Sequence, residues 1–325
     1  MLAVATNQVT DSGVWQDLNR QSADEEGLVV VTGSAGWAGR SLLDGIIANT
    51  SICQNGRLVA LGRRSSTIKV RDKTLVVHPH AFLQDIRQPV TLLAPFAFLT
   101  RNRVAEFGPA AYVNENLALV SETVRIIQLL QPSRVISVSS GAAAIDYVGT
   151  IPSLSVEPYG FLKNVEEWGL TSVCRERDIG LAIGRLWGAS GDTMPIARGY
   201  ALSDFIMQAQ AGNPVHVRSS QNVYRHYVDM RQFLAVLVGL AGIKAQTLLD
   251  SGGDKVEIGE VARLVASEFG MGVTRSALDE VETNALCPNP DAFAAAASGL
   301  GIDLAPLHAQ VLATIRGHKN QLGMH

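Results

Sequence analysis

The sequence predicts an α/β protein built on a doubly wound, mainly parallel sheet, followed by a smaller mixed C-terminal substrate lobe. Three observations support this fold class. The buried-strand pattern Leu28–Val31 runs through Thr32 into glycines at every third position, Gly33, Gly36 and Gly39. Short apolar strands then alternate with amphipathic helices, which is typical of parallel sheets. The length of 325 residues is enough for one such domain and an added lobe.

The glycine turn predicts a dinucleotide-binding site of the Rossmann type. One glycine permits a tight turn, a second lets a phosphate approach the backbone, and a third lets helix and strand pack closely. The helix begins near Trp37, and its N-terminal N–H groups and partial positive charge suit a pyrophosphate. We therefore assign Gly33, Gly36, Trp37 and Gly39 to cofactor binding. A plain strand–helix turn is the alternative.

The second strand, Leu58–Leu61, indicates which cofactor is bound. An NAD site usually carries an acidic residue about 20 residues after the glycine turn. Here the chain reads Gly62-Arg63-Arg64-Ser65-Ser66 instead. Guanidinium groups bind phosphate through a bidentate fork, so Arg63 and Arg64 suit the 2′-phosphate of NADP(H). NADP(H) is favoured and NAD(H) is the alternative, as is a solvated basic turn.

The remaining elements follow in order. A helix over Ser41–Asn49 buries Leu42, Leu43, Ile46 and Ile47 on one face. Further strands are expected over Lys73–Val77, Val90–Ala94, Val135–Val138 and Gly180–Leu186, with a long helix over Ala110–Leu130. Few residues separate Asp85 from the strand at Val90, so the usual intervening helix is expected to be missing.

The segment Tyr159-Gly160-Phe161-Leu162-Lys163 carries the candidate chemistry. On a helix, residues four positions apart share a face, so the phenol and the ammonium can point into one cleft. The ammonium favours the phenolate and lowers the tyrosine pKa toward the working range. Ser139 and Ser140 end the preceding strand and supply a hydroxyl at the same sheet edge.

In order and spacing, these motifs resemble the extended short-chain dehydrogenases/reductases, which act mostly on nucleotide-linked sugars. The resemblance covers about residues 27–270 and implies catalytic roles for Ser140, Tyr159 and Lys163, with Ser139 beside the substrate. Arg225 matches an arginine that binds the sugar nucleotide's diphosphate. The resemblance also implies cofactor contacts from Asp85, Ile86, Ala94, Pro95, Asn116 and Leu186, with Asp85 and Ile86 beside the adenine.

The implied activity is NADP(H)-dependent oxidoreduction at a sugar carbon of a nucleotide sugar, by a 4-keto reductase or an epimerase. Where 4,6-dehydratases of this group carry acidic residues, the sequence reads Gly141-Ala142-Ala143, which argues against water elimination. One alternative is a decarboxylase like UDP-xylose synthase, suggested by the segment at Asp85. Another is a non-catalytic sensor or scaffold that binds the dinucleotide.

Three regions are expected along the chain. Residues 1–26 read as a mobile N-terminal extension, 27–190 as the dinucleotide-binding domain, and 191–325 mainly as the substrate lobe with segments returning to the first domain. The resemblance also implies a homodimer through the helices at Ala110–Leu130 and Tyr159–Arg175.

Composition excludes several classes of function. A net charge of −3 gives no basic footprint for nucleic acid or for an anionic membrane, and the apolar runs are too short to span a bilayer. Three scattered cysteines read as reduced thiols, so we expect a cytoplasmic protein. No spacing suggests a metal site, and His78-Pro79-His80 reads as a polar loop.

Overall fold

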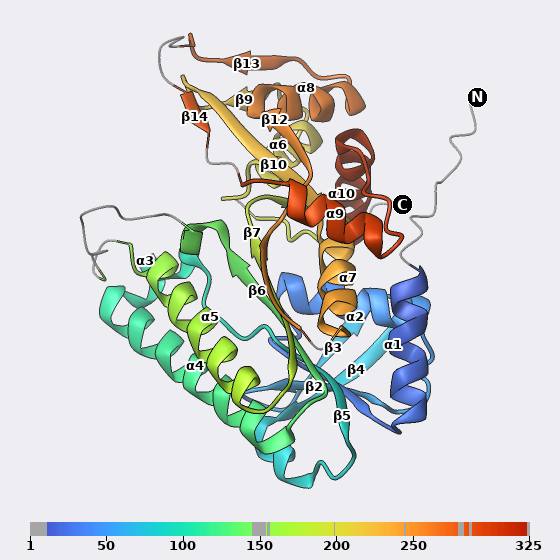
Figure 1. Cartoon of the computed structure of the whole chain (residues 1–325). Helices are drawn as coiled ribbons and strands as arrows, with labels where there is room; N and C mark the ends of the chain where they lie inside the picture. The colour runs from blue at the N-terminus through green and yellow to red at the C-terminus, as the bar shows by residue number, and fades with distance from the viewer. Residues whose placement is uncertain are drawn as a thin grey trace.

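A large, mostly parallel sheet forms the body of the molecule, and a smaller lobe stands at its carboxyl edge (Figure 1). The computed structural model describes residues 12–144, 154, 157–197, 199–243, 245–278, 283–285 and 288–323. The core of the body lies on both faces of the sheet, and a separate core fills the lobe.

Within the described residues, eight strands make the main sheet. In spatial order they are β11 (Gln246–Asp250), β7 (Gly180–Leu186), β6 (Arg134–Ser140), β5 (Val90–Pro95), β1 (Leu28–Thr32), β2 (Leu58–Gly62), β4 (Lys73–Pro79) and β3 (Ser66–Val70). Neighbouring strands run parallel except β3 and β4. The chain order reverses on either side of β1, where ligands bind in such sheets. The predicted doubly wound parallel sheet is confirmed.

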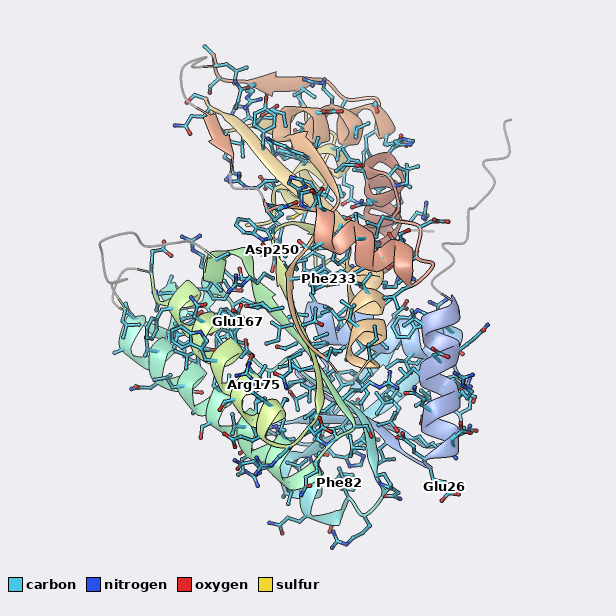
Figure 2. The ribbon with its side chains drawn as sticks, in the orientation of Figure 1. Glu26, Phe82, Glu167, Arg175, Phe233 and Asp250 are labelled. Carbon is cyan, nitrogen blue, oxygen red and sulfur yellow. The ribbon has the colours of Figure 1, made fainter. Side chains whose placement is uncertain are left out.

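Helices cover both faces of this sheet (Figure 1). One face carries α4 (Pro109–Leu130) and α5 (Pro158–Glu176), and the other carries α1 (Ser12–Asp24), α2 (Trp37–Asn49) and α7 (Met230–Ala241). Each face has its own cluster of buried apolar side chains. Phe233 of α7, labelled in Figure 2, packs so closely on β7 that a Cβ on Gly184 would lie 2.4 Å from its ring.

The first strand and helix form as the sequence predicts. All five residues of β1 are buried, as expected for a central strand with helices on both faces. Gly33 has a φ of +61°, and a Cβ on Gly39 would lie 2.4 Å from the Gly33 carbonyl oxygen. The turn therefore needs glycine at both positions, one for conformation and one for close approach.

The N-terminal region differs from the mobile extension expected over residues 1–26. Residues 12–24 form α1, in which Trp15 and Leu18 are completely buried against α2 and α7. A Cβ on Gly45 would lie 2.8 Å from the Trp15 ring, so α2 is shaped to receive this indole. The expectation of a mobile segment was therefore wrong for residues 12–24, because the short apolar stripe of this helix is hidden among polar residues. Residues 1–11 lie outside the described residues.

The region after β2 contains a strand that the sequence did not predict. β4 covers the expected strand, and β3 pairs with it antiparallel to form the edge of the sheet. The short 3₁₀ helix η1 (His80–Asp85) ends at Asp85, and no helix lies between Asp85 and Val90 of β5, which confirms the expected shortening there. Three more short elements border the carboxyl edge of the sheet: η2 (Arg101–Arg103), α3 (Val104–Phe107) and η3 (Gly141–Ala144).

The smaller lobe is built mainly from the second half of the chain. Its elements are β8 (Ala189–Ser190), α6 (Ala201–Gln210), β9 (Val215–Val217), β10 (Asn222–Asp229), β12 (Asp254–Glu257), α8 (Ile258–Glu268), β13 (Val273–Arg275), β14 (Thr283–Ala285) and α10 (Leu307–Gln321). The helix α9 (Asp291–Gly299) instead packs on α7 and β11 of the main body. Within the described residues, β10 pairs with β12, β14 and β8. From the same half of the chain, α7 and β11 return to the main body. The predicted boundary near residue 190 stays a prediction.

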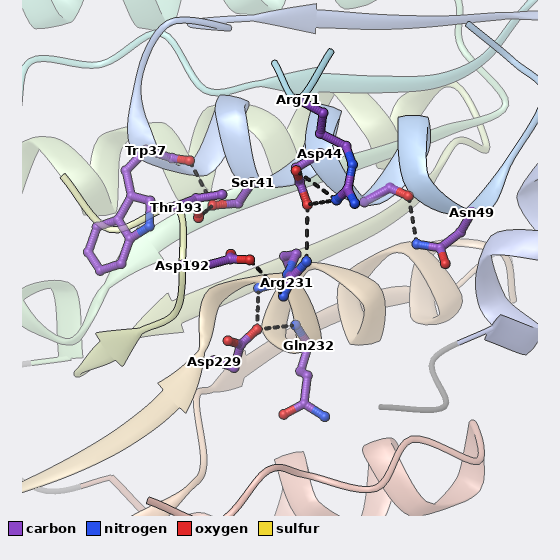
Figure 3. Close-up of polar contacts among 11 residues, drawn as sticks. Trp37, Ser41, Asp44, Asn49, Arg71, Asp192, Thr193, Asp229, Arg231 and Gln232 are labelled. Atoms are coloured by element: carbon purple, nitrogen blue, oxygen red, sulfur yellow. Dashed lines mark hydrogen bonds and ion pairs between the residues drawn. The ribbon is translucent and has the colours of Figure 1, made fainter. Parts of the chain in front are cut away.

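A charged network joins α2 and α7 to the loop after β8 (Figure 3). Arg231, near the start of α7, contacts carboxylate oxygens of Asp44 and Asp192 at 3.1 Å each. Arg71 also contacts Asp44 at 3.1 Å. Asp229 caps α7 by accepting hydrogen bonds from the backbone of Arg231 and Gln232. This network anchors the lobe to the helix that begins at the glycine turn.

Candidate active site

The glycine turn has the shape predicted for a phosphate cradle at the start of α2. A Cβ on Gly33 would lie 2.5 Å from the Phe96 carbonyl, so the turn and the loop after β5 approach more closely than any side chain allows. Gly36 is the N-cap residue of α2. Because glycine has no side chain, no capping group at this position covers the helix N-terminus. The first N–H groups of α2 therefore face the adjoining cavity, as a dinucleotide pyrophosphate requires.

A cavity of about 770 Å³ extends from this turn along the ends of β2 and β4. Arg63, Arg64 and Ser66 line it, as the sequence predicts for a site that holds the adenosine half of the cofactor. The Arg63 side chain is 72% exposed and lies 3.5 Å from Glu115 of α4. Both arginines can thus reach a phosphate without breaking a buried ion pair.

Asp85 and Ile86 do not line this cavity, in contrast to their predicted place beside the adenine. The carboxyl end of β4 is at Pro79, so the residue that follows there is His80, which lines the cavity instead. From His80, η1 carries the chain away from this end of the sheet, leaving Asp85 exposed and Ile86 packed on the core. The His80 ring is held by Glu122, with Nδ1 3.2 Å from the carboxylate.

Three further residues predicted to contact the cofactor do not line this cavity themselves. Ala94 and Pro95 are buried at the end of β5, paired with Val31 and Thr32, and the lining comes from the loop that follows. Asn116 is buried and its side-chain oxygen accepts a hydrogen bond of 2.8 Å from the Leu99 N–H. Asn116 therefore shapes the loop over the cavity and is not part of its lining.

A second, inner cavity of about 300 Å³ brings the predicted catalytic residues together. Ser140 ends β6, while Tyr159 and Lys163 lie one turn apart on α5, and all three line this cavity with the glycine turn and Trp37. Leu186, predicted to contact the cofactor, lines it from the end of β7. The structure thus places one hydroxyl, one phenol and one ammonium around the space next to the phosphate cradle.

Ser139 lines the same cavity, but its hydroxyl is engaged away from the role predicted for it. Its hydroxyl is buried and donates a hydrogen bond to Glu167, whose carboxylate also accepts two hydrogen bonds from Arg185, at 2.9 and 2.7 Å. Figure 2 labels Glu167 on α5, beside the sheet. The Ser139 hydroxyl therefore joins α5 to β6 and β7, whereas Ser140 lines both this cavity and the larger one toward the lobe.

Lys163 sits in a closely defined environment. Its ammonium donates hydrogen bonds to the Val138 carbonyl at 3.0 Å and to Glu166 at 2.7 Å, and it lies 3.8 Å from the centre of the Phe98 ring. Phe98 also meets the Tyr159 ring edge to face, with centroids 6.1 Å apart. The sequence analysis missed both Phe98 and Glu166, since no motif marks them.

An outer cavity of about 560 Å³ continues from the catalytic group toward the lobe. Arg225 of β10 lines it, as predicted, together with Arg101 and Asn102 after β5. Trp187 and Tyr200, two residues that the sequence analysis missed, line both this cavity and the inner one.

The Trp187 ring is fixed at the junction of the two cavities. Its Nε1 donates a 2.8 Å hydrogen bond to Asp250, labelled in Figure 2 at the end of β11. A Cβ on Gly141 would lie 2.4 Å from the Trp187 ring, so this aromatic wall requires glycine there.

Tyr159 interacts electrostatically with Tyr112 and Tyr200, and the short helix η3 that follows β6 carries no acidic side chain. Burial raises the pKa of Tyr200, and the nearby Tyr159 raises it further. Gly141, Ala142 and Ala143 carry no acid or base, while Asp146 lies outside the described residues. Among these residues, the Tyr159 hydroxyl is the group that can exchange a proton with an oxygen atom of a bound molecule.

No helix in the described part of the chain combines the length and apolar character needed to cross a membrane. In the same residues, no group of three or more His, Cys, Asp or Glu side chains is arranged to hold a metal ion.

Comparison with known proteins identifies a matching family and several solved structures with a similar fold. Residues 29–241 match the profile of the NAD dependent epimerase/dehydratase family. Among curated proteins, no sequence matches the chain.

Several solved structures share the fold at low sequence identity. An epimerase of Methanothermobacter thermautotrophicus has a TM-score of 0.71 at 16% identity, with 95% of this chain and 97% of that chain covered. MoeE5 in complex with UDP-glucose and NAD has a TM-score of 0.67 at 19% identity, with 91% and 100% covered. UDP-glucose 4-epimerase of Thermotoga maritima, with UDP-glucose, has a TM-score of 0.64 at 17% identity, with 90% and 99% covered.

Proposed function

The chain belongs to the NAD dependent epimerase/dehydratase family, as its resemblance to the extended short-chain dehydrogenases/reductases implied, and we propose that it carries out NAD(P)-dependent oxidoreduction at a sugar carbon of a nucleotide sugar. Within this class we favour a 4-epimerase or a 4-keto reductase. The observation that carries the proposal is the inner cavity, where Ser140, Tyr159 and Lys163 adjoin the phosphate cradle.

The proposed mechanism uses the described residues around one substrate oxygen. The nicotinamide, when bound, supplies or accepts the hydride. Tyr159 takes the proton from the sugar hydroxyl, or returns it to the keto oxygen, because proton transfer must accompany hydride transfer. Ser140 donates a hydrogen bond to the same oxygen and fixes its position. Lys163 favours the phenolate through its charge and offers an N–H to the nicotinamide ribose.

We propose NADP(H) as the preferred cofactor. The MoeE5 structure and the Thermus thermophilus UDP-glucose 4-epimerase structure contain NAD. In this chain, however, Arg63, Arg64 and Ser66 line the cavity next to the end of β2, where the 2′-phosphate of NADP would lie. Two guanidinium groups and a hydroxyl favour a phosphate over a ribose hydroxyl.

The outer cavity is proposed to hold the substrate's diphosphate. Arg225 and Arg101 line it from opposite sides, β10 of the lobe and the loop after β5. The two guanidinium groups suit a doubly charged diphosphate, and the Trp187 and Tyr200 rings offer apolar faces for a sugar or base. Relatives such as MoeE5 and the Thermotoga maritima enzyme contain UDP-glucose in their structures.

A homodimer through α4 and α5 is also proposed. Both helices cover the same face of the sheet, and each exposes a large apolar side chain, Leu117 on α4 and Trp168 on α5. The Trp168 side chain is 64% exposed, which leaves apolar surface for a second copy of the chain to cover.

A reducing compartment such as the cytoplasm is also proposed for this protein, since Cys53 and Cys174 are free thiols.

Mass spectrometry of small molecules released from the purified, denatured protein tests the proposed ligands. We expect an NADP(H) or NAD(H) signal and, where substrate copurifies, a nucleoside diphosphate sugar. The native protein is also titrated with NADP(H) and NAD(H). The proposal would be contradicted if a different class of nucleotide were released and neither dinucleotide bound in these titrations.

A further inference from the structure

A histidine stands at the carboxyl end of β4, in the cavity that does not contain Asp85. The register of β2 and β4 pairs Gly62 with Pro79, so the next residues, Arg63 and His80, lie at the same edge of the sheet. Both line the cavity of about 770 Å³. An imidazole ring therefore lies in the same cavity as the arginine proposed to bind the 2′-phosphate.

The His80 ring is held in one orientation by a carboxylate of α4. Arg125 donates hydrogen bonds of 2.7 and 2.8 Å to Glu122 and holds the pKa of that carboxyl below its usual value. An ionised carboxylate only accepts hydrogen bonds, so the His80 Nδ1, 3.2 Å from Glu122, carries the hydrogen. The charge of Glu122 is balanced by Arg125, without a second proton on the ring.

The other ring nitrogen, Nε2, is left as an acceptor. In a neutral imidazole one nitrogen donates and the other accepts, so a hydrogen on Nδ1 leaves a lone pair on Nε2. In the part of the chain that the structure describes, no hydrogen bond engages the His80 Nε2. Because this side chain is 23% exposed and lines the cavity, the acceptor is available to a bound molecule.

The same cavity has apolar walls that suit a flat base. Leu61 of β2, Val77 of β4 and Leu119 of α4 line it together with His80. A heterocyclic ring can lie against these side chains while its polar edge meets the imidazole. The cavity thus combines a place for a base with a single acceptor at that place.

Two glutamates of α4 set the spacing between the imidazole and the arginine. Glu115 lies 3.5 Å from Arg63, and Glu122 holds His80. The two glutamates are seven positions apart and share a face of the helix, at a separation of about 10 Å along its axis. This span is comparable with the distance from the amino group of an adenine to a phosphate on its ribose.

We propose that the Nε2 atom of His80 accepts a hydrogen bond from the 6-amino group of the cofactor's adenine, which makes His80 a specificity-determining residue for the base. This inference rests on the proposed function for the identity of the cofactor as a dinucleotide. A purine with a 6-oxo group presents an acceptor where adenine presents a donor. Two acceptors would then face each other, so the site discriminates against that base.

Dinucleotides that differ only in the base test the proposal without any turnover. NADP and its 6-oxo analogue, nicotinamide hypoxanthine dinucleotide phosphate, are titrated calorimetrically into wild type, His80→Phe and His80→Gln. We expect the wild type to favour adenine by about fivefold or more, because the analogue leaves the Nε2 acceptor unpaired. His80→Phe keeps an aromatic ring without the acceptor and should abolish the preference, whereas the amide oxygen of His80→Gln should restore part of it.

His78→Phe is the matched control. His78 lies two residues earlier in β4, and its ring stacks on Phe82 with centroids 4.1 Å apart. This variant should keep the wild-type preference for adenine. The preference for NADP(H) over NAD(H), assigned to Arg63 and Arg64, should also be unchanged in His80→Phe.

A wild type that binds both bases equally, or a preference that persists in His80→Phe, would overturn the proposal. A loss of the NADP(H) over NAD(H) preference in His80→Phe would also overturn it, because the ring would then serve the 2′-phosphate. The wild-type comparison remains decisive if a variant does not fold. Absence of binding for every dinucleotide would overturn the proposed cofactor as well, whereas equal binding of the two bases would overturn this inference alone.

Discussion

At the scale of single residues, Arg63 and Arg64 decide the proposed cofactor preference. They occupy the place where a carboxylate would bind the ribose of NAD, and both side chains line the cavity at the end of β2. A carboxylate there would repel a 2′-phosphate, whereas a guanidinium forms charge-assisted hydrogen bonds with it.

Replacement of both arginines by alanine should weaken NADP(H) binding while leaving NAD(H) binding nearly unchanged. Each lost charge-assisted contact should cost about 1.5–3 kcal/mol of binding free energy. Isothermal titration with both cofactors measures the effect, with Arg87→Ala, on the exposed segment before β5, as the control. A wild-type protein that binds NAD(H) more tightly than NADP(H) would contradict the assignment.

Some residues of the site could be predicted from sequence motifs, and others could not. Gly33, Tyr159 and Lys163 could be predicted because backbone geometry and helix periodicity determine their positions relative to one another. Asp85 could not be placed, since the direction of the chain after β4 depends on how η1 packs its buried Leu83. Phe98, Glu166 and Trp187 carry no motif, and they reach the site through tertiary packing.

At the scale of elements, α1 shows how a short helix can escape detection. Its buried residues Val14, Trp15 and Leu18 follow the spacing of one helical face, but the helix is otherwise polar and lies outside the repeating strand–helix pattern. β3 escaped for a related reason: its alternating polar and apolar residues follow directly on the basic turn that was assigned to the cofactor. By contrast, α4 and the strands β5, β6 and β7 have strong apolar patterns and were predicted.

Trp15→Ala tests whether α1 is an integral part of the fold. The indole is completely buried and fits against Gly45, so its removal leaves a large cavity. We expect a loss of about 3–5 kcal/mol in the free energy of unfolding, measured by denaturant titration. Gln16→Ala, at the exposed neighbouring position, should change it by less than about 0.5 kcal/mol. Equal stability of the two variants would show that α1 does not stabilise the body.

At the scale of the whole molecule, charged side chains that are buried or partly buried join the body to the lobe. Arg231 connects Asp44 of α2 with Asp192 beside β8, and Asp229 caps the same helix from the end of β10 (Figure 3). Burial is the main cause that raises the pKa of Asp229 to about 6, and Asp192 raises it further. The protonation state of the junction therefore changes in mildly acidic solution.

Asp229→Asn should remove part of the pH dependence of stability. The pKa of Asp229 is raised above that of the unfolded chain, so the folded protein binds more protons between pH of about 4 and about 6. The contribution of this carboxyl to stability is thus greatest below that window and is lost as the pH rises through it. Relative to Asp229→Asn, whose amide oxygen can still cap α7, the wild type should lose about 1–3 kcal/mol of unfolding free energy across this range.

Urea titrations of both proteins from pH 4 to 7 measure this difference. Asp72→Asn, at a side chain that is 76% exposed, serves as the control and should follow the wild type throughout. A difference between wild type and Asp229→Asn that stays constant with pH would refute the assignment of this titration to Asp229.

The proposed dimer also belongs to the scale of the whole molecule. Trp168→Glu places a charge in the proposed interface on α5, so light scattering should show a fall from twice the chain mass of 34.7 kDa to a single chain. Ile243→Glu, at an equally exposed apolar residue after α7, should leave the mass unchanged. A monomeric wild type, or a dimer that tolerates Trp168→Glu, would exclude this interface.

The central claim is that Ser140, Tyr159 and Lys163 carry out oxidoreduction at a sugar carbon of a nucleotide sugar. The most direct measurement is product analysis by nuclear magnetic resonance, with nucleotide hexoses or 4-keto nucleotide sugars and NAD(P)(H), for wild type and Tyr159→Phe. We predict a C4 epimer or a reduced 4-keto sugar from the wild type. Turnover in Tyr159→Phe should be lower by a factor of about 10²–10⁴, with dinucleotide binding retained. A 4-keto-6-deoxy product from an unmodified nucleotide hexose, or full activity in Tyr159→Phe, would contradict the account.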